Sequence, residues 1–352
     1  MSIGIIGVGG VARYAHLPAY RKLGLRVEAL CDRNPEILRQ VGVEFDVPIR
    51  TTDPRELISS SSVSIIDLAT PPDSHRELLE LVAESGKPVL VQKPLCVDYE
   101  ELKAIRRLRE RGARVRLNVT GRYVSAWRKV RDLVRSDALG KPLLCTIVNR
   151  DWWDRAPGRW DHTIRQYVIF EMVIHHLDLC LFWFGLPERL TARTGSHPRQ
   201  LMHQANWATV TLEYANGLVV QIVDDWAMSE YAFASGHPFE RVHLTGENGA
   251  VRANSERVEW SELGRNSIQV WHLPRPGQQL PGEQLDINWF PDSFGQSMRA
   301  FIEALDQRQD GHEDWDHLSD LTGLTLAVSD AATSSGWIDW KSYGRDVSSA
   351  SR

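Results

Sequence analysis

Short hydrophobic runs rich in β-branched residues alternate with longer segments of mixed polarity through the first third of the chain. The hydrophobic runs lie at residues 3–6, 27–31, 63–69, 89–91 and 115–119. The segments between them, at residues 10–22, 35–41, 74–85 and 98–111, have the spacing of amphipathic helices. Strands that alternate with helices are typical of a parallel sheet with crossover helices. The pattern therefore predicts a doubly wound α/β domain over residues 1–121.

The pattern changes after residue 122, where longer strands of alternating polarity follow one another. Strands are predicted at residues 142–150, 207–214 and 218–226, with a hairpin turn at Asn216-Gly217 between the last two. Helical periodicity is present at residues 166–183, 294–306 and 318–335. We therefore predict a second domain, of α+β class, over residues 122–352, with a mainly antiparallel sheet.

A glycine-rich turn joins the first predicted strand to the first predicted helix. Its sequence matches G-x-G-x-x-A in the strand-to-helix context that a dinucleotide-binding turn requires, and its residues are Gly7, Val8, Gly9, Gly10, Val11 and Ala12. Gly7 permits the tight turn, Gly9 lets the backbone approach a pyrophosphate, and Ala12 allows close helix packing. The amino end of the helix attracts the phosphate charge. This turn predicts a Rossmann domain that binds a nicotinamide dinucleotide.

An acidic residue ends the second predicted strand. Asp32 lies where a carboxylate accepts hydrogen bonds from the adenosine ribose hydroxyls, which favours NAD. Arg33 follows it and offers a partner for a 2′-phosphate or a surface for the adenine ring, so NADP stays possible.

Composition and charge indicate a small-molecule partner. The chain has 41 basic and 46 acidic residues among 352, with a net charge of −5, so it has no broad attraction to nucleic acid or anionic lipid. The sequence contains no run of about 18 apolar residues, which is the length that a bilayer-spanning helix needs. We therefore expect a cytoplasmic protein without membrane association. The four cysteines form no C-x-x-C pair, which argues against zinc or a redox dithiol, and no metal is predicted.

Three further stretches carry a resemblance to a known family. They are residues 69–75 (ATPPDSH), 86–95 (GKPVLVQKPL) and 171–178 (EMVIHHLD). In this order the sequence resembles the glucose-fructose oxidoreductase, inositol dehydrogenase and rhizopine catabolism (Gfo/Idh/MocA) family. The resemblance implies a Rossmann domain followed by an α+β domain with an open, mainly antiparallel sheet, through which homodimers or homotetramers form. It also implies redox chemistry on a sugar, cyclitol or derivative with NAD(H) or NADP(H).

The resemblance assigns further residues to the cofactor and marks two departures from the family pattern. Beyond the glycine turn, the implied cofactor contacts are Thr70, Pro71, His75, Gln92 and Lys93. Gln92 replaces the glutamate of the family's E-K-P motif, and Glu171 replaces the aspartate of its D-x-x-x-H motif. Because both replacements keep a hydrogen-bonding group, we expect altered geometry and substrate choice more than lost chemistry.

Lys93 and His175 are the predicted catalytic residues. The resemblance places Lys93 near the nicotinamide, and a lysine at the carboxyl end of a doubly wound sheet projects toward bound ligands. It acts as a base only if desolvated or near another cation, and otherwise it orients the substrate hydroxyl. His175 is the better proton carrier, because imidazole titrates near neutral pH.

The neighbours of His175 leave alternatives open. Glu171 lies four residues earlier on the same helical face, where it would orient His175 or bind a substrate hydroxyl. His176 points about 100° away and is not expected to face the site. The competing interpretations are a structural core histidine at 175, or a metal site formed by Glu171, His175 and His176.

An aromatic and arginine-rich loop precedes this helix. Its tryptophans Trp152 and Trp153 suit stacking on a sugar ring, and Arg155 and Arg159, or Arg165, suit a hydroxyl or carboxylate. The alternative is a packing or subunit-interface loop.

Three residues near the end of the first domain, Asn118, Arg122 and Tyr123, are further candidates for substrate binding. The predicted function is thus an NAD(P)-dependent sugar or polyol dehydrogenase or reductase. The alternative is a dinucleotide- or sugar-sensing regulator of the same fold without turnover.

Overall fold

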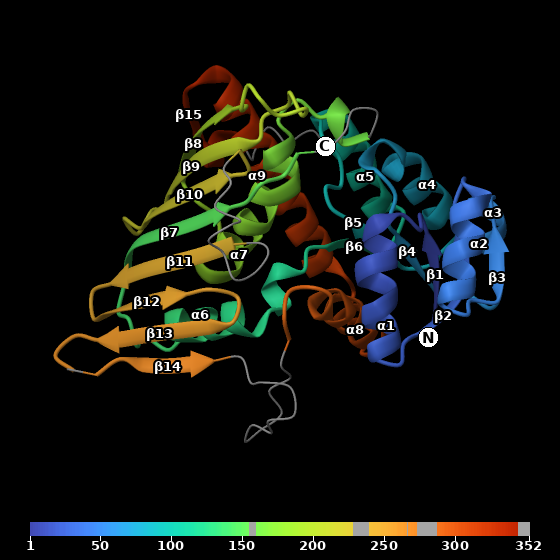
Figure 1. The fold of residues 1–352 in the computed structure, drawn as a ribbon, viewed down its shortest axis with the longest axis horizontal. Helices are drawn as coiled ribbons and strands as arrows, with labels where there is room; N and C mark the ends of the chain where they lie inside the picture. The colour runs from blue at the N-terminus through green and yellow to red at the C-terminus, as the bar shows by residue number, and fades with distance from the viewer. Residues whose placement is uncertain (155–159, 228–238, 266, 273–286, 344–352) are drawn as a thin grey trace. The chain divides into compact units, whose positions relative to one another are not determined.

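The computed structural model describes residues 1–154, 160–227, 239–265, 267–272 and 287–343. Within these residues the chain forms two compact units, shown as ribbons in Figure 1. The first unit contains Met1–Thr120 and Trp289–Thr322, and the second contains residues 121–288 and 323–343 as far as they are described. Each unit has its own sheet.

The first unit contains a six-stranded parallel sheet in the order β3-β2-β1-β4-β5-β6. Its strands are β1 (Ser2–Ile6), β2 (Arg26–Cys31), β3 (Ile49–Thr51), β4 (Ile65–Leu68), β5 (Val89–Gln92) and β6 (Val115–Asn118). Its helices are α1 (Leu17–Lys22), α2 (Pro35–Glu44), α3 (Pro54–Ser59), α4 (His75–Ser85), α5 (Tyr99–Glu110) and α8 (Asp292–Asp306). This is the Rossmann strand order, and it confirms the predicted doubly wound class.

Apolar side chains explain why the late helix α8 belongs to the first unit. Phe294, Met298 and Phe301 of α8 join the same buried cluster as Tyr20 of α1 and Ile5 of β1. Phe294, Met298 and Phe301 recur on one face of α8, so their burial in this cluster removes a continuous apolar surface of the helix from water. The sequence pattern placed this helix correctly along the chain but did not identify the sheet that it covers.

The carboxylate of Asp67 is buried against the start of α1. The helix is preceded by a π-helical turn, Ala12–His16, and the His16 Nδ1 atom lies 2.7 Å from Asp67 Oδ2 of β4. The Tyr20 hydroxyl donates to the same carboxylate oxygen at 2.7 Å. All three side chains are fully buried. A buried carboxylate is costly unless hydrogen-bonded, and here two groups from one helical segment contact its Oδ2 atom.

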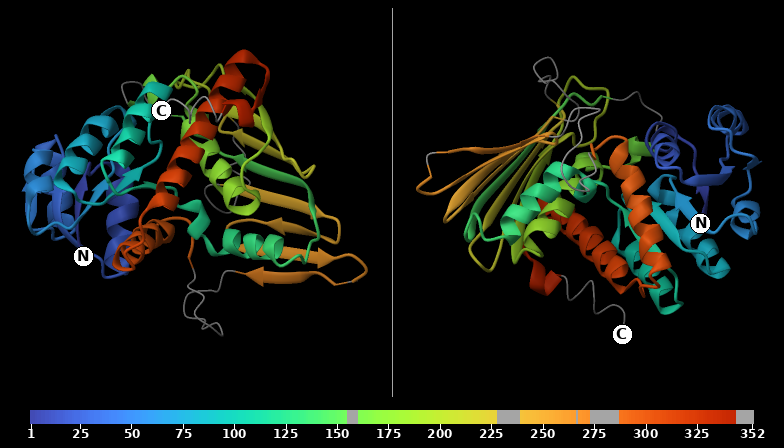
Figure 2. Two further views of the ribbon diagram at one scale, coloured as in Figure 1. Left: turned by 180° about the vertical axis from the view of Figure 1, so that it is seen from behind. Right: turned by 90° about the horizontal axis from the view of Figure 1, so that it is seen from below.

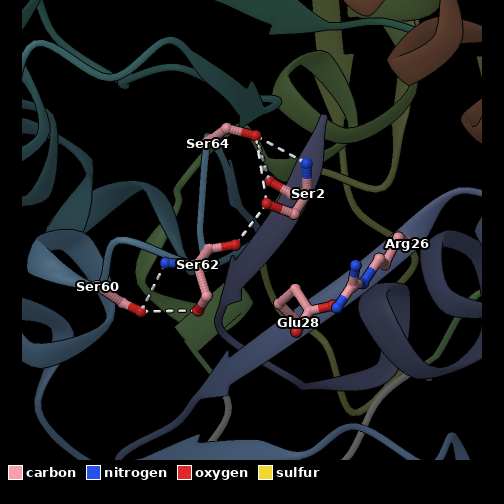
Figure 3. Close-up of polar contacts among 6 residues, drawn as sticks. All are labelled: Ser2, Arg26, Glu28, Ser60, Ser62 and Ser64. Atoms are coloured by element: carbon pink, nitrogen blue, oxygen red, sulfur yellow. Dashed lines mark hydrogen bonds and ion pairs between the residues drawn. The ribbon is translucent and has the colours of Figure 1, made fainter.

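Serine side chains form hydrogen bonds at the end of this parallel sheet where its strands begin (Figure 3). The Ser2 N–H donates to Ser64 Oγ at 2.7 Å, and the Ser60 and Ser62 hydroxyls lie 2.8 Å apart. Arg26 forms an ion pair with Glu28 beside them. These contacts lie at the amino ends of β1, β2 and β4, away from the glycine turn at the carboxyl end of β1.

The second unit contains a nine-stranded sheet in the order β14-β13-β12-β11-β7-β10-β9-β8-β15. Its strands are β7 (Pro142–Arg150), β8 (Arg189–Gly195), β9 (Trp207–Glu213), β10 (Val219–Asp225), β11 (Phe239–Gly246), β12 (Gly249–Ala253), β13 (Arg257–Glu262), β14 (Gln269–His272) and β15 (Trp337–Asp339). All pairings are antiparallel except that of β7 with β10. The expected mainly antiparallel sheet is confirmed, and so is the Asn216-Gly217 turn, where Gly217 has φ of +88° between β9 and β10.

Helices cover one face of this sheet (Figure 2). They are α6 (Ser125–Arg135), a π-helical turn (Ile169–Val173) that continues into α7 (Ile174–Phe184), and the later part of α9 (His312–Ser334). The alternation of burial along the strands shows which side chains face them, because Val220 and Ile222 of β10 are fully buried and Gln221 is exposed. The second face, with Gln221, Arg241 and His243, is exposed in this chain.

The four cysteines are free thiols in the interior of the two units. Burial raises the pKa of Cys31 and of Cys145 to about 12, and Cys96 and Cys180 are buried as well. Among the described residues, no helix is long and apolar enough to cross a membrane.

The Asp67 contacts generate a stability prediction. Asp67→Ala removes the acceptor of two buried donors, so we expect the free energy of unfolding to fall by about 3 kcal/mol in urea denaturation. Tyr20→Phe removes a single hydrogen bond and is expected to cost about 1 kcal/mol. The exposed Glu110→Ala is the control, with a change of less than about 0.5 kcal/mol. Equal effects of Asp67→Ala and Glu110→Ala would contradict this account.

Candidate functional site

The glycine turn has a conformation that explains each glycine separately. Gly7 has φ of +90°, and a Cβ there would lie 2.8 Å from backbone atoms of Ala69. A side chain at position 7 is therefore excluded by both conformation and space. A Cβ at Gly9 or Gly10 would meet no described atom within 4 Å. The turn thus has a closed side against the end of β4 and an open side that fits a pyrophosphate.

The Asp32 carboxylate lies beside this turn. Its Oδ2 accepts from the Val8 N–H at 2.9 Å and its Oδ1 accepts from the Asn34 N–H at 2.9 Å. These contacts fix the carboxylate, and each oxygen has a further lone pair for a ribose hydroxyl. Arg33 is exposed next to it. The turn and Asp32 therefore fit the adenosine half of a dinucleotide.

The segments that follow β4 and β5 are joined through a buried histidine. The His75 Nδ1 lies 2.9 Å from the Leu95 carbonyl oxygen and its Nε2 lies 2.9 Å from that of Thr70. Burial lowers the pKa of His75, which favours the neutral ring, whereas the two carbonyl contacts favour the charged form. Pro71 and Thr70 are half-buried at the same edge of the sheet.

Two amides meet at the carboxyl ends of β5 and β6. Gln92 and Asn118 are register partners, and the Asn118 Nδ2 donates to Gln92 Oε1 at 3.0 Å. Both side chains are buried. The glutamine at the family's glutamate position is therefore matched by an amide partner, so this part of the site is neutral. Lys93, half-buried, follows directly.

The second unit holds the other predicted catalytic residue. Glu171 is half-buried in the π-helical turn, and His175 is 8% exposed in the first turn of α7. A π-helical turn is common at functional sites. His176 is fully buried and faces the sheet, where its ring nitrogens contact Asp224 and Glu240.

Arg122 and Tyr123 lie in a short 3₁₀ turn, Gly121–Tyr123, ahead of α6. The Arg122 guanidinium is paired with both oxygens of the buried Asp178 and lies 5.4 Å from the Phe182 ring centre. Its positive charge is thus paired with Asp178 of α7. A contact of Arg122 with substrate stays a prediction.

The aromatic loop is only partly described. Trp152 is 41% exposed, and the Trp153 ring packs 5.4 Å from that of Trp226. Trp152 is therefore the more accessible of the two rings for a sugar face. Arg155 and Arg159 lie outside the described residues.

Sequence reasoning missed two buried polar clusters, one around Asp67 and one around His176. The signal for the first was a lone aspartate within the apolar strand β4, whose sequence is IIDL. For the second, Asp224 and Glu240 lie 48 and 64 residues after His176 along the chain, and the strand register brings them to one face.

Comparison with known families agrees with this geometry. Residues 1–119 match the model of an oxidoreductase family with an NAD-binding Rossmann fold, GFO_IDH_MocA, and residues 127–252 match the GFO/IDH/MocA C-terminal domain. The chain belongs to the Gfo/Idh/MocA family of oxidoreductases. The predicted family, the NAD-binding domain and the oxidoreductase class are thereby confirmed.

Relatives in this family cover most of the chain. A D-apiose dehydrogenase from Paraburkholderia graminis is 29% identical over 72% of this chain and 67% of its own length. An inositol 2-dehydrogenase from Rhizobium meliloti is 24% identical over 86% of this chain and 88% of its own. A solved oxidoreductase from Agrobacterium radiobacter, in complex with NAD⁺, L-tartaric acid and magnesium, has a TM-score of 0.82 at 21% identity, covering 97% and 98% of the two chains.

Replacing Gly7 or Gly9 by alanine is expected to have different effects, the first on stability and the second on NAD binding. Gly7→Ala is expected to lower the free energy of unfolding by about 2 kcal/mol or more, because it combines a positive φ with a backbone clash. Gly9→Ala meets open space, so the free protein should keep its stability while NAD affinity, measured by calorimetry, falls at least about tenfold. Unchanged NAD affinity in a folded Gly9→Ala protein would refute the assignment of the open side.

Proposed function

We propose that the chain transfers a hydride between the nicotinamide of NAD(P) and a hydroxyl or carbonyl of a sugar, cyclitol or sugar derivative. The names of its relatives support this substrate class, since one acts on D-apiose and another on inositol. The first unit supplies the dinucleotide site and the second supplies substrate contacts.

The position of Lys93 is the observation that carries the proposal. In the Rossmann order the second half of the sheet serves the nicotinamide end of the dinucleotide. Lys93 directly follows β5 in that half, at the same edge as the glycine turn. A half-buried ammonium there orients a substrate hydroxyl and stabilises negative charge as it develops on the oxygen.

His175 is proposed as the proton carrier. When bound, the nicotinamide ring supplies the hydride acceptor or donor. In the oxidation direction the substrate carbon loses its hydride, and the imidazole of His175 takes the hydroxyl proton; reduction reverses both transfers. Glu171, in the π-helical turn before it, orients the ring or binds a neighbouring hydroxyl.

Substrate contacts are proposed for Trp152, Trp153, Arg155, Arg159, Asn118, Arg122 and Tyr123. Trp152 has the exposed ring area that stacking requires. For Arg122, the ion pair with Asp178 leaves the planar guanidinium in a fixed orientation.

The uncovered face of the nine-stranded sheet supports a homodimer or homotetramer in which a second copy lies on that face. Its exposed side chains include the polar Gln221, Arg241 and His243 and also Leu144, which is 44% exposed, so an interface of mixed polar and apolar character is expected. A cytoplasmic location stays a prediction.

The Lys93→Met variant tests the catalytic part of the proposal. A panel of sugars and polyols is assayed by absorbance of the reduced nicotinamide, and the variant is compared with the wild type on the best substrate. Turnover is expected to fall at least about 100-fold because the hydroxyl loses its orienting charge, while NAD affinity changes little.

Lys87→Met is the matched control, since Lys87 belongs to a segment before β5 and donates to the Ser60 carbonyl. Full activity of Lys93→Met would overturn the assignment. Failure of the whole panel, with tight NAD binding, would favour a sensor without turnover.

Asp32 sets a separate prediction for cofactor choice. Asp32→Ala removes the ribose acceptor and a negative charge beside Arg33, so the ratio of NAD affinity to NADP affinity is expected to fall at least about tenfold. Titration of the protein with each dinucleotide measures the ratio. An unchanged ratio in a folded variant would assign cofactor selection to another residue.

A further inference from the structure

The first turn of α7 is connected to the sheet of the second unit through one imidazole ring. The His176 Nδ1 lies 3.0 Å from Asp224 Oδ2, and its Nε2 lies 2.6 Å from Glu240 Oε1. The His176 and Asp224 side chains are fully buried and Glu240 is 4% exposed. Carboxylates accept hydrogen bonds, so the ring donates from both nitrogens, which only the charged imidazolium can do.

The two carboxylates come from strands on either side of β7. Asp224 of β10 and Glu240 of β11 are both register partners of Asn149 of β7, so the three residues form one row across the sheet. Neighbouring strands lie about 4.8 Å apart, so the backbones of Asp224 and Glu240, one strand to either side of β7, lie about 10 Å apart. The His176 ring lies between the two side chains and contacts both carboxylates. Burial lowers the pKa of His176, but the two carboxylates outweigh it and raise it to about 10. These contacts favour the charged ring, while burial also raises the pKa of Asp224 and of Glu240.

Apolar packing alone gives α7 little rotational preference. Every residue from Ile174 to Cys180 is buried, so the helix has apolar side chains on several faces. A helix of this kind does not have the single apolar stripe that normally defines which side faces the core. Directional polar contacts must supply the missing specificity.

Two other polar contacts of α7 lie further along the helix. Asp178 pairs with Arg122, whose long side chain comes from a short turn, and the Trp183 Nε1 donates to the Trp127 carbonyl at 3.0 Å. His176 differs because its partners belong to sheet strands, and it lies next to His175. Successive helical residues project about 100° apart, so fixing the direction of His176 also fixes that of His175.

We propose that His176 is a positioning residue that sets the rotation of α7, so that His175 and Glu171 are presented to the substrate. The proposal rests on the role of His175 in the proposed function. It assigns Asp224 and Glu240 to the same task, through His176, although none of the three touches the substrate.

Two variants, one with three substitutions and one with two, distinguish an effect on the position of His175 from an effect on stability. The first, H176L/D224L/E240M, replaces the whole cluster by apolar residues of similar size, a change that is often neutral or stabilising for a buried ion cluster. The second, D224N/E240Q, removes the negative charges but keeps a hydrogen bond at each ring nitrogen, because a neutral imidazole donates to one amide and accepts from the other. Urea denaturation verifies that both proteins are folded.

The expected result is a loss of turnover that stability does not explain. H176L/D224L/E240M should lose at least about tenfold in kcat on the best substrate of the sugar and polyol panel, because small displacements of reacting groups are costly. Its Kd for NAD should be unchanged, since the dinucleotide residues lie in the first unit. D224N/E240Q should retain kcat within about threefold of the wild type. Wild-type kcat in the apolar variant, or an equal loss in both variants, would overturn the proposal.

Two further measurements distinguish failure of this inference from failure of the proposed function. His175→Gln must itself lose turnover, and full activity of that variant would refute the proton-carrier role rather than the positioning role. Crystal structures of the two multiple variants provide a readout without activity. The His175 ring is expected to be displaced relative to the sheet in the apolar variant and to keep its place in D224N/E240Q. An unmoved His175 in the apolar variant would show that the cluster does not position it.

Discussion

The close approach of two backbone segments at Gly7 is the constraint on which the dinucleotide site depends. Because position 7 has no side chain, the end of β1 packs directly against Ala69 at the end of β4. The same turn brings the Val8 N–H to the Asp32 carboxylate at the end of β2. The missing side chain at Gly7 thus allows the ends of β1 and β4 to meet, and the Val8 contact holds the end of β2 beside them.

Both units use a related arrangement of polar groups to hold a helix that lies next to functional residues in the sequence. In each, a π-helical turn lies at or just before the helix, and a buried histidine of that segment contacts a carboxylate on a sheet strand. His16 meets Asp67 in the first unit, and His176 meets Asp224 and Glu240 in the second. Apolar packing is tolerant of small rotations, whereas hydrogen bonds to fixed strands are not. Polar groups that are expensive to bury therefore give these helices a defined orientation.

The sequence was most informative where local chemistry dictates structure. The glycine turn follows from the special conformations of glycine, and the positions of β1, β2, β4, β5 and β6 follow from the hydrophobic periodicity. Asp32 stands out because it ends the second of these strands. Short elements escaped prediction: β3 has three residues, and α3 has six and begins with Pro54 after the capping Asp53. The strand register was also beyond reach, because Asp224 and Glu240 become neighbours of His176 only through pairing with β7. Asp67 was noticeable in the sequence as an aspartate within an apolar strand. Nothing in the sequence identified His16, one turn after the glycine motif, as its partner.

The interior location of all four cysteines has a practical consequence for spectroscopy. Since Cys31, Cys96, Cys145 and Cys180 are buried and burial raises the pKa of each thiol, maleimide dyes should react slowly with the folded native chain. A single cysteine introduced at an exposed position would then carry a fluorophore without removal of the native thiols. One such label on each unit would make the separation of the two units measurable by energy transfer as ligands bind.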